Sequence, residues 1–381
     1  MLTSLDDTLW HQLPTTFDHV GTSDPRFFDR YWFAGYAPDG STAVQITLGA
    51  YRNMNVLDAG VVVVHRGKQH NVRASRSLGR EVDPTCGPIT VVPTVPLQEF
   101  RLCVAPGDHG VSGDLTWRGV LPPAEEQPHF ARSRGRVTED YRRFDQIGVV
   151  SGWVQVGGER IEITNWWACR DHSWGVRPRM GIKEPVTGPK VSLAESGFAM
   201  AFLFFSTDTV AGHVLFDRRG DDEGYTTGDL AWRDDTRHEQ PLSGTDLAVT
   251  LHEGTRRFRE CTLAATRPGG GTVRFHCAAL GPAIAMQGLG YSGGFDDRAG
   301  LGIWRAEEHL ETDVWDVSHP SVIGYPDGRS NEHWHRIQPV RVTVEGLDDS
   351  SSDHTGGVPT GSGQGSMTLV LSGTLPWLGL P

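Results

Sequence analysis

The feature that most constrains this chain is the regular interruption of short apolar segments by glycine and proline. The 47 glycines and 23 prolines occur along the whole sequence and separate segments rich in Val, Thr, Ile, Phe and Trp. Segments of this kind, bounded by turn residues, are typical of a β-sandwich or β-barrel and not of βαβ units. At roughly 100–200 residues per domain, 381 residues indicate two domains. We therefore predict an all-β fold of two antiparallel barrel or sandwich domains packed together.

Several segments carry more specific signals. The run Val61–Val64 is fully apolar, as in a strand covered on both faces. Residues 152–163 alternate with period two around a Gly-Gly pair, which predicts a hairpin. Short helices are expected only at residues 5–12 and 124–130. Residues 346–366 are rich in Gly, Ser and Asp and are predicted to form a mobile loop before a closing strand.

Charge and cysteine usage narrow the partners. A net charge of -12 makes nucleic acid an unfavourable partner. Five cysteines without a CxxC pair indicate free thiols and not a disulfide framework. No secretory signal is visible, and the longest apolar run, residues 198–205, is too short for a spanning helix. We expect a cytoplasmic protein, with peripheral membrane contact left open and the oligomeric state unspecified.

The densest cluster of reactive side chains lies in the segment Arg170–Gly175. In an extended strand Asp171 would lie on one face, and Arg170, His172 and Trp174 on the other. A carboxyl and an imidazole whose pKa values shift in opposite directions are suited to proton transfer in a dry pocket. The alternative is an Arg–Asp ion pair and a histidine that only stabilise the end of a barrel.

Tryptophan is concentrated near the same segment. Trp153, Trp166, Trp167 and Trp174 fall within one short stretch. Their indoles could line a pocket for an apolar ligand, or they could simply pack in the core of the barrel.

The segment 152–177 resembles the strand-hairpin-strand that carries the "DHxWG" signature of the AttH-like and carotenoid 1,2-hydratase (hydroxyneurosporene synthase) superfamily. More narrowly, Arg170–Arg177 is similar to the signature of an actinobacterial branch of that superfamily. The segments Arg30–Tyr36 and Glu307–Val317 also fit this branch.

The resemblance implies two lipocalin-like β-domains, residues 1–190 with the site inside the barrel and residues 191–381. It implies a hydrophobic small-molecule substrate and chemistry without a metal or organic cofactor. Characterised members hydrate an isolated C=C bond of a carotenoid, and related proteins cyclise or rearrange terpenoids or polyketides. In the implied mechanism a carboxylic acid protonates the alkene, aromatic faces shield the cation, and water captures it.

Residue by residue, His172 and Trp174 match the His and Trp of the signature. The family's Tyr-x-Asp on a following strand is best matched by Leu215–Asp217, although its Tyr is replaced by Leu215. Asp171 and Asp217 are thus rival acids, and Asp217 could instead only open a turn. The predicted catalytic residues are Asp171, His172, Trp174 and Asp217. The predicted substrate-binding residues are Trp153, Trp166, Trp167, Arg170, Phe202, Phe204 and His213.

A second polar cluster lies near the C-terminus. Glu307, His309, Glu311 and Asp313 would share one strand face, and the segment His333–His335 follows on another strand. These groups could bind a divalent metal, form a solvated face with ion pairs, or form a polar seam between domains. The sequence therefore leaves three functions open: an acid–base hydratase, dehydratase, cyclase or isomerase; a carrier of an apolar molecule; and a metal-dependent enzyme.

Overall fold

The computed structural model describes residues 2–80, 83–133, 135–182, 188, 197–220, 222–234, 236–347 and 361–381. Its described elements are strands and four short 3-10 helices, which confirms the all-β prediction. The elements in chain order are η1 (Ser4–Asp7), β1 (Phe27–Tyr36), β2 (Thr42–Tyr51), η2 (Arg52–Met54), β3 (Val56–His65), β4 (Lys68–Ser77), β5 (Thr85–Cys86), β6 (Ile89–Val95), β7 (Glu99–Val104), β8 (Val111–Gly119), β9 (Ala124–Glu125), β10 (His129–Ser133), β11 (Arg136–Val156), β12 (Glu159–Val176), β13 (Phe198–Thr207), β14 (Val210–Arg219), β15 (Asp222–Trp232), β16 (His238–Glu239), β17 (Ser243–Leu251), β18 (Phe258–Thr266), β19 (Thr272–Ala279), β20 (Ile284–Ala285), η3 (Met286–Leu289), β21 (Glu308–Asp316), β22 (Val322–Gly324), β23 (Ser330–Glu332), β24 (Arg336–Glu345), β25 (Ser362–Ser372) and η4 (Pro376–Leu378).

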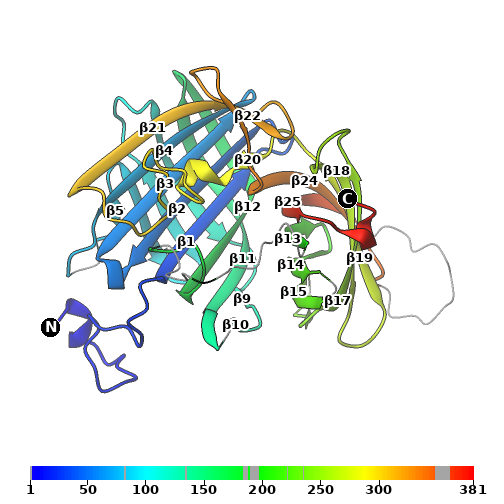
Figure 1. Cartoon of the computed structure of the whole chain (residues 1–381), viewed down its shortest axis with the longest axis horizontal. Helices are drawn as coiled ribbons and strands as arrows, with labels where there is room; N and C mark the ends of the chain where they lie inside the picture. The colour runs from blue at the N-terminus through cyan, green and yellow to red at the C-terminus, as the bar shows by residue number, and fades with distance from the viewer. Residues whose placement is uncertain are drawn as a thin grey trace.

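The strands form two sheets that lie side by side (Figure 1). The first sheet has the order β23-β22-β21-β4-β3-β2-β1-β12-β11-β8-β7-β6-β5, with β9 and β10 beside β11. The second has the order β16-β15-β14-β13-β25-β24-β19-β18-β17, with β20 beside β24. Strand β21 comes from the C-terminal half but pairs with β4, from Glu308 opposite Arg76 to Asp316 opposite Lys68. The domain boundary at residue 190 stays a prediction, and the sheets exchange strands across it.

The first sheet curls until β5 contacts β3 and β4, so that it encloses its own apolar core. The run of four valines in strand β3 does not alternate with polar residues because both faces of the strand are covered. Val61 and Val63 pack in the enclosed core, whereas Val62 and Val64 pack in a separate cluster with Phe204 of the second sheet. The predicted double coverage of this strand is confirmed.

The two sheets meet through that separate cluster. Trp32 and Tyr36 of β1 and Phe204 of β13 belong to it. The hydroxyl of Tyr36 also lies 2.8 Å from the hydroxyl of Ser366 on β25. The outer face of the first sheet around β1 and β3 is therefore an internal surface of the protein.

The hairpin predicted at residues 152–163 is confirmed, because β11 and β12 turn at Gly157 and Gly158. The helix predicted at 124–130 is wrong. These residues form β9 and β10 instead, since the long strand β11 offers them an edge for backbone hydrogen bonds. The helix predicted at 5–12 shrinks to η1. Of the predicted loop, residues 348–360 lie outside the described residues, and β25 already begins at Ser362.

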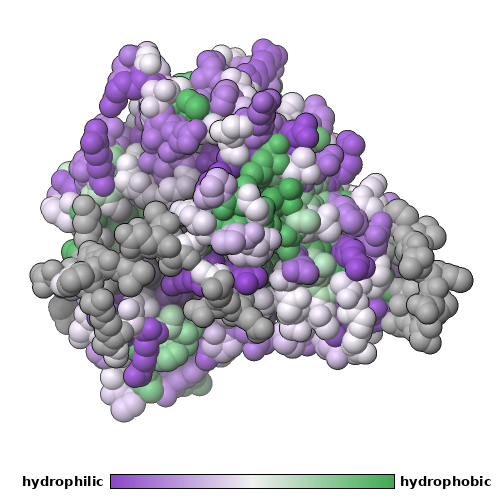
Figure 2. Space-filling model, turned by 45° about the vertical axis from the view of Figure 1, so that its right-hand side comes forward, coloured by the Kyte–Doolittle hydropathy of each residue, from purple (hydrophilic) through white to green (hydrophobic). Residues whose placement is uncertain are grey.

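None of the helices in the described residues combines the length and the apolar character needed to cross a membrane. Figure 2 shows a face that is largely hydrophilic, with apolar side chains gathered mainly in one central area.

Candidate active site

Strand β12 carries the Arg170–Gly175 segment between two long partners. Asp171 lies opposite Trp32 of β1 and opposite Asp145 of β11. Arg170 lies over rings of the enclosed core, which places it and the alternate residues His172 and Trp174 on the inner face. Asp171 lies on the outer face, which looks toward the second sheet. The predicted separation of Asp171 from its neighbours is therefore observed.

The inner-face residues lie in an aromatic group. The Nε2 atom of His172 is 2.7 Å from a carboxylate oxygen of Asp29. The ring centroid of His172 lies 4.4 Å from that of Tyr31 and 5.2 Å from that of Trp174. Trp174 is 38% exposed, so this group lies at a rim of the sheet interior and not in its closed core.

The glycine of the segment has a structural role. Gly175 has φ +131°, and a Cβ there would lie 2.4 Å from the carbonyl oxygen of Asp140 on β11. A side chain would therefore push β12 away from β11.

The outer face of β11 and β12 holds a buried polar group shared by both sheets, here called the interface cluster. Its members are Glu126, His129, Arg143, Asp145, His213 and Asp229. Glu126 follows β9, His129 begins β10, and Arg143 and Asp145 lie on β11. His213 of β14 and Asp229 of β15 come from the second sheet.

Glu126 is fully engaged. Arg143 Nη1 donates to its Oε1 at 3.1 Å, and His129 Nε2 contacts its Oε2. Burial opposes ionisation of Glu126, but Arg143 and His129 outweigh it and hold its pKa well below its usual range. Glu126 is therefore a carboxylate at neutral pH.

Asp145 has the opposite environment. It is 2% exposed, and neither carboxyl oxygen receives a hydrogen bond from the described residues. Burial, and then the negative charge of Glu126, raise its pKa well above the ordinary value. Two adjacent carboxyls with opposite shifts indicate one proton held on Asp145.

A line of polar contacts leads from Asp145 into the second sheet. His213 Nε2 lies 3.4 Å from Oδ2 of Asp145, and His213 Nδ1 lies 2.6 Å from Oδ1 of Asp229. The second oxygen of Asp229 lies 3.0 Å from Nε2 of the partly exposed His238. Burial opposes ionisation of Asp229, but His213 outweighs it and lowers its pKa to about 2. An ionised Asp229 can only accept, so Nδ1 of His213 carries a proton.

Aromatic rings lie beside this cluster. The guanidinium of Arg143 lies 5.1 Å from the ring centroid of Phe202, and Phe202 and Phe204 lie 6.2 and 6.4 Å from His213. Trp32 of the first sheet lies 5.7 Å from Phe204. Acid, imidazole and aromatic faces thus meet between the sheets.

Some predicted residues come together and others do not. Asp171, Phe202, Phe204 and His213 all lie at this interface, and burial raises the pKa of the Asp171 carboxyl. Asp217 accepts the backbone N–H of Tyr225 at 3.2 Å, as expected for a residue at a strand end.

The tryptophans are dispersed. Trp153 stacks under Arg160 on the hairpin, and Trp166 packs against the enclosed core. Trp167 stacks on Tyr36 in the interface between the sheets. The indoles that could have lined one pocket therefore belong to two different faces of the sheet.

Sequence reasoning missed Glu126, Arg143, Asp145 and Asp229. The sequence carries little signal for Arg143 and Asp145, because residues 136–146 are rich in charged side chains and read as a solvated segment.

The second predicted polar cluster forms ion pairs. His309 Nε2 lies 2.7 Å from Glu311, and Arg73 Nη2 lies 2.8 Å from Asp313. Within the described ranges, only Glu126, Asp145 and His213 bring three ligand atoms within 4.8 Å of one another. Since both oxygens of Glu126 are already engaged, two free ligands remain, fewer than protein metal sites commonly use.

Comparisons with known proteins add a family. A family model described as "Family of unknown function (DUF8625)" matches residues 2–341. No curated protein matches the chain. Among solved structures, the crystal structure of CghA matches with 13% identity and a TM-score of 0.45, covering 92% of this chain and 90% of that chain. At this level the similarity supports no inference about activity.

Proposed function

The chain belongs to the DUF8625 family, and we propose that it is an acid–base enzyme without a cofactor that acts on a C=C bond of a hydrophobic, terpenoid-like substrate. The observation that carries the proposal is Asp145, a buried carboxyl that receives no hydrogen bond from the described residues and whose pKa is raised well above its ordinary value by burial and by the charge of Glu126. Asp145 replaces Asp171 and Asp217 as the proposed donor. Asp171 lies across from it and adds negative charge that favours its protonated form.

In the proposed reaction Asp145 gives its proton to one alkene carbon, and the other carbon becomes a cation. The π-faces of Trp32, Phe202 and Phe204 stabilise that charge. Water then bonds to the cation and loses a proton to Nε2 of His213, which returns it to Asp145 across 3.4 Å. Asp229 holds the imidazole in the tautomer that leaves Nε2 free to accept.

The same cation allows related outcomes. Attack of a second C=C bond on the cation closes a ring and moves the charge to another carbon, and loss of a proton from there to His213 completes a cyclisation. Direct loss of a neighbouring proton gives isomerisation, and the reverse of hydration gives dehydration. Because Asp145 is buried, the substrate reaches it only when side chains between the sheets move.

Deuterium incorporation tests this proposal. Purified protein is incubated in heavy water with a panel of acyclic terpenoid alkenes, and products are analysed by mass spectrometry. We expect the wild-type protein to place deuterium on an alkene carbon and Asp145→Asn to lose at least a hundredfold in rate, the usual contribution of general acid catalysis. Asp58→Asn is the matched control, since Asp58 is another buried carboxyl of the first sheet whose pKa is raised by burial. The mass of the product distinguishes hydration from cyclisation or isomerisation.

Three results would contradict the proposal. Unchanged incorporation in Asp145→Asn would remove Asp145 as the donor. Loss of incorporation only in Asp171→Asn would return that role to Asp171. Inhibition by a chelator, reversed by a divalent metal, would favour a metal-dependent reaction.

A further inference from the structure

The inner face of strand β12 carries a second unusual charge, the guanidinium of Arg170. It is 1% exposed and lies in the interior enclosed by the first sheet. Its Nε and Nη2 both donate to Oε1 of Gln146, at 2.9 and 2.7 Å. Its Nη1 is buried without a hydrogen-bond partner, and no carboxylate of the described residues forms an ion pair with it. A buried cation without a counter-ion is costly and calls for a reason.

Aromatic rings make this cation tolerable without neutralising it. The centroids of Phe100, Phe144, Trp117 and Phe33 lie 4.7, 5.0, 5.1 and 6.0 Å from the guanidinium carbon. Cation–π attraction offsets part of the desolvation cost, but it does not occupy the free N–H groups of Nη1. Desolvation lowers the pKa of Arg170 to about 10, which still leaves it charged at neutral pH.

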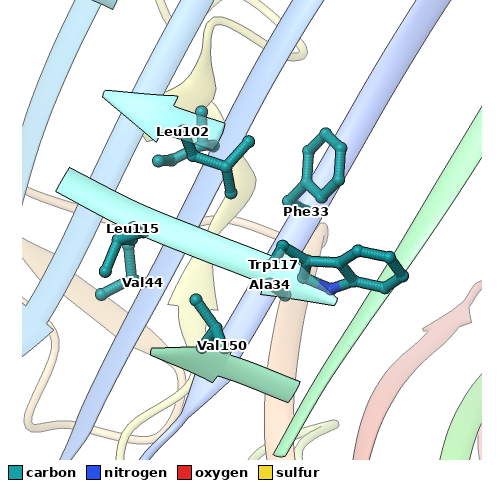
Figure 3. Close-up of a pocket in the computed structure, with 9 residues that line it drawn as sticks. Phe33, Ala34, Val44, Leu102, Leu115, Trp117 and Val150 are labelled. Carbon is teal, nitrogen blue, oxygen red and sulfur yellow. The ribbon is translucent and has the colours of Figure 1, made fainter. Parts of the chain in front are cut away.

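The space around Arg170 limits which ligands could reach its guanidinium. Phe33 and Trp117 also line a small apolar cavity deeper in the interior, together with Val44, Leu102, Leu115 and Val150 (Figure 3). That cavity measures about 10 Å³, which accommodates roughly one water molecule. On the other side of Arg170, Phe144 contacts the partly exposed rim residues His172 and Trp174. The deep cavity is too small for an apolar ligand, so a ligand of Arg170 would enter from the rim, and the ring of Phe144 would have to move to admit it.

We propose that Arg170 is the anion-binding residue of a ligand site at this rim, and that the site takes a small carboxylic acid with an apolar tail. The carboxylate would accept from Nη1, and the tail would contact the rings of Tyr31, Phe144 and Trp174. This site lies on the inner face of the first sheet, whereas Asp145 lies on the outer face. A test of the site is therefore independent of a test of the proposed reaction. It gives the first sheet a ligand-binding role of its own.

Calorimetric titration with octanoate and with octanol tests the site, because the two probes share a tail and differ in charge. We expect the wild-type protein to bind octanoate at least tenfold more tightly than octanol. Arg170→Met should remove that preference. Arg160→Met is the matched control, since Arg160 also lies over an indole, 4.0 Å from Trp153, but on the exposed hairpin. It should keep the wild-type preference.

A second measurement needs no substitution. In nitrogen-15 spectra of the wild-type protein, the Nε–H resonance of Arg170 should move on titration with octanoate and stay in place with octanol. Equal affinity for the two probes in the wild-type protein would overturn the proposal. So would a preference for octanoate that survives in a folded Arg170→Met, or octanoate binding that leaves the Arg170 resonance unmoved.

Discussion

At the scale of residues, the interface cluster shows how the supply of donors sets the charge of a carboxyl. Glu126 and Asp229 are both buried, but each contacts basic side chains and stays ionised. Asp145 lies among them with no donor, so the proton that the group retains belongs to it. Carboxyl groups in one cluster thus differ in protonation, because their neighbours differ: Glu126 and Asp229 are ionised, and Asp145 is the acid.

Replacing Asp145 should increase stability. An unfolded Asp titrates near 3.9, below the native pKa of Asp145, so the native state binds the extra proton between these values. The free energy of unfolding therefore falls as pH rises through that window. We expect Asp145→Asn, which has no carboxyl to ionise, to be more stable than the wild-type protein at pH 7, and each unit by which the native pKa exceeds 3.9 adds about 1.4 kcal/mol to that gain. Urea unfolding at pH 7 and pH 3.5 would show the gain shrinking in acid, and an equal gain at both would contradict the assignment.

The contribution of Asp229 to stability should have the opposite pH dependence. Its pKa is lowered from 3.8 to about 2, so its contribution is complete above pH 4 and is lost as pH falls toward 2. The shift corresponds to about 2 kcal/mol at neutral pH, because each pKa unit is worth about 1.4 kcal/mol. Asp229→Asn should lose that stability at pH 6 and show a weaker acid dependence in urea unfolding. Asp246→Asn, which changes an exposed carboxyl on β17 of the same sheet, should leave both quantities nearly unchanged.

At the scale of elements, two strands account for most of the site. Strand β12 directs Arg170 to one face and Asp171 to the other, so one short segment serves two separate environments. Strand β21 crosses from the C-terminal half to cover the edge at β4, where Arg73 holds both Glu311 and Asp313. An edge that would otherwise be open to aggregation is paired within the chain.

The Arg73 contacts should be essential for keeping β21 on β4. The side chain of Arg73 is almost fully buried, and its closest acidic partner is Asp313. Asp313→Ala leaves the guanidinium with Glu311 at 3.5 Å and should destabilise the protein by roughly 2–4 kcal/mol. Hydrogen exchange should rise in residues 308–316. The double variant Arg73→Met, Asp313→Ala should recover part of the loss, because it removes the buried guanidinium that lost its closest partner, while Glu311 keeps His309 at 2.7 Å. No recovery would mean that the pair acts through packing alone.

At the scale of the whole molecule, the two sheets depend on each other. Asp145 of the first and His213 of the second lie 3.4 Å apart, Tyr36 reaches Ser366, and β21 is exchanged between the halves. Separation would expose both an apolar surface and buried charges.

Thermal unfolding should therefore be a single cooperative transition. In scanning calorimetry at pH 7, we expect the van't Hoff and calorimetric enthalpies to agree, as they do for one unfolding unit. Two resolved transitions would show that the sheets unfold separately, and they would favour independent domains divided near residue 190. Tyr36→Phe removes one contact between the sheets and should leave the transition single while lowering its midpoint by about 1 °C, in proportion to about 1 kcal/mol for a chain of this length.

The sequence predicted the local strand structure of the site better than it predicted which residues make up the site. Period-two alternation separated Asp171 from Arg170 correctly, and the valine run of β3 announced a strand covered on both faces. Phe202, Phe204 and His213 lie beside the interface cluster, and their predicted role in substrate binding stays a prediction. Asp145, Glu126 and Asp229 were not, because nothing in their own segments shows which distant residues lie opposite them.

The sequence alone determined the β class, the hairpin at Gly157 and Gly158, and the alternation of β12, since turn chemistry and the strand period act within a few residues. Only the tertiary structure decided which carboxyl keeps a proton. A pKa depends on burial and on charges within a few ångströms. For Asp145 those charges are Glu126, just after β9, Arg143 on β11 and Asp171 on β12, which are brought together by folding.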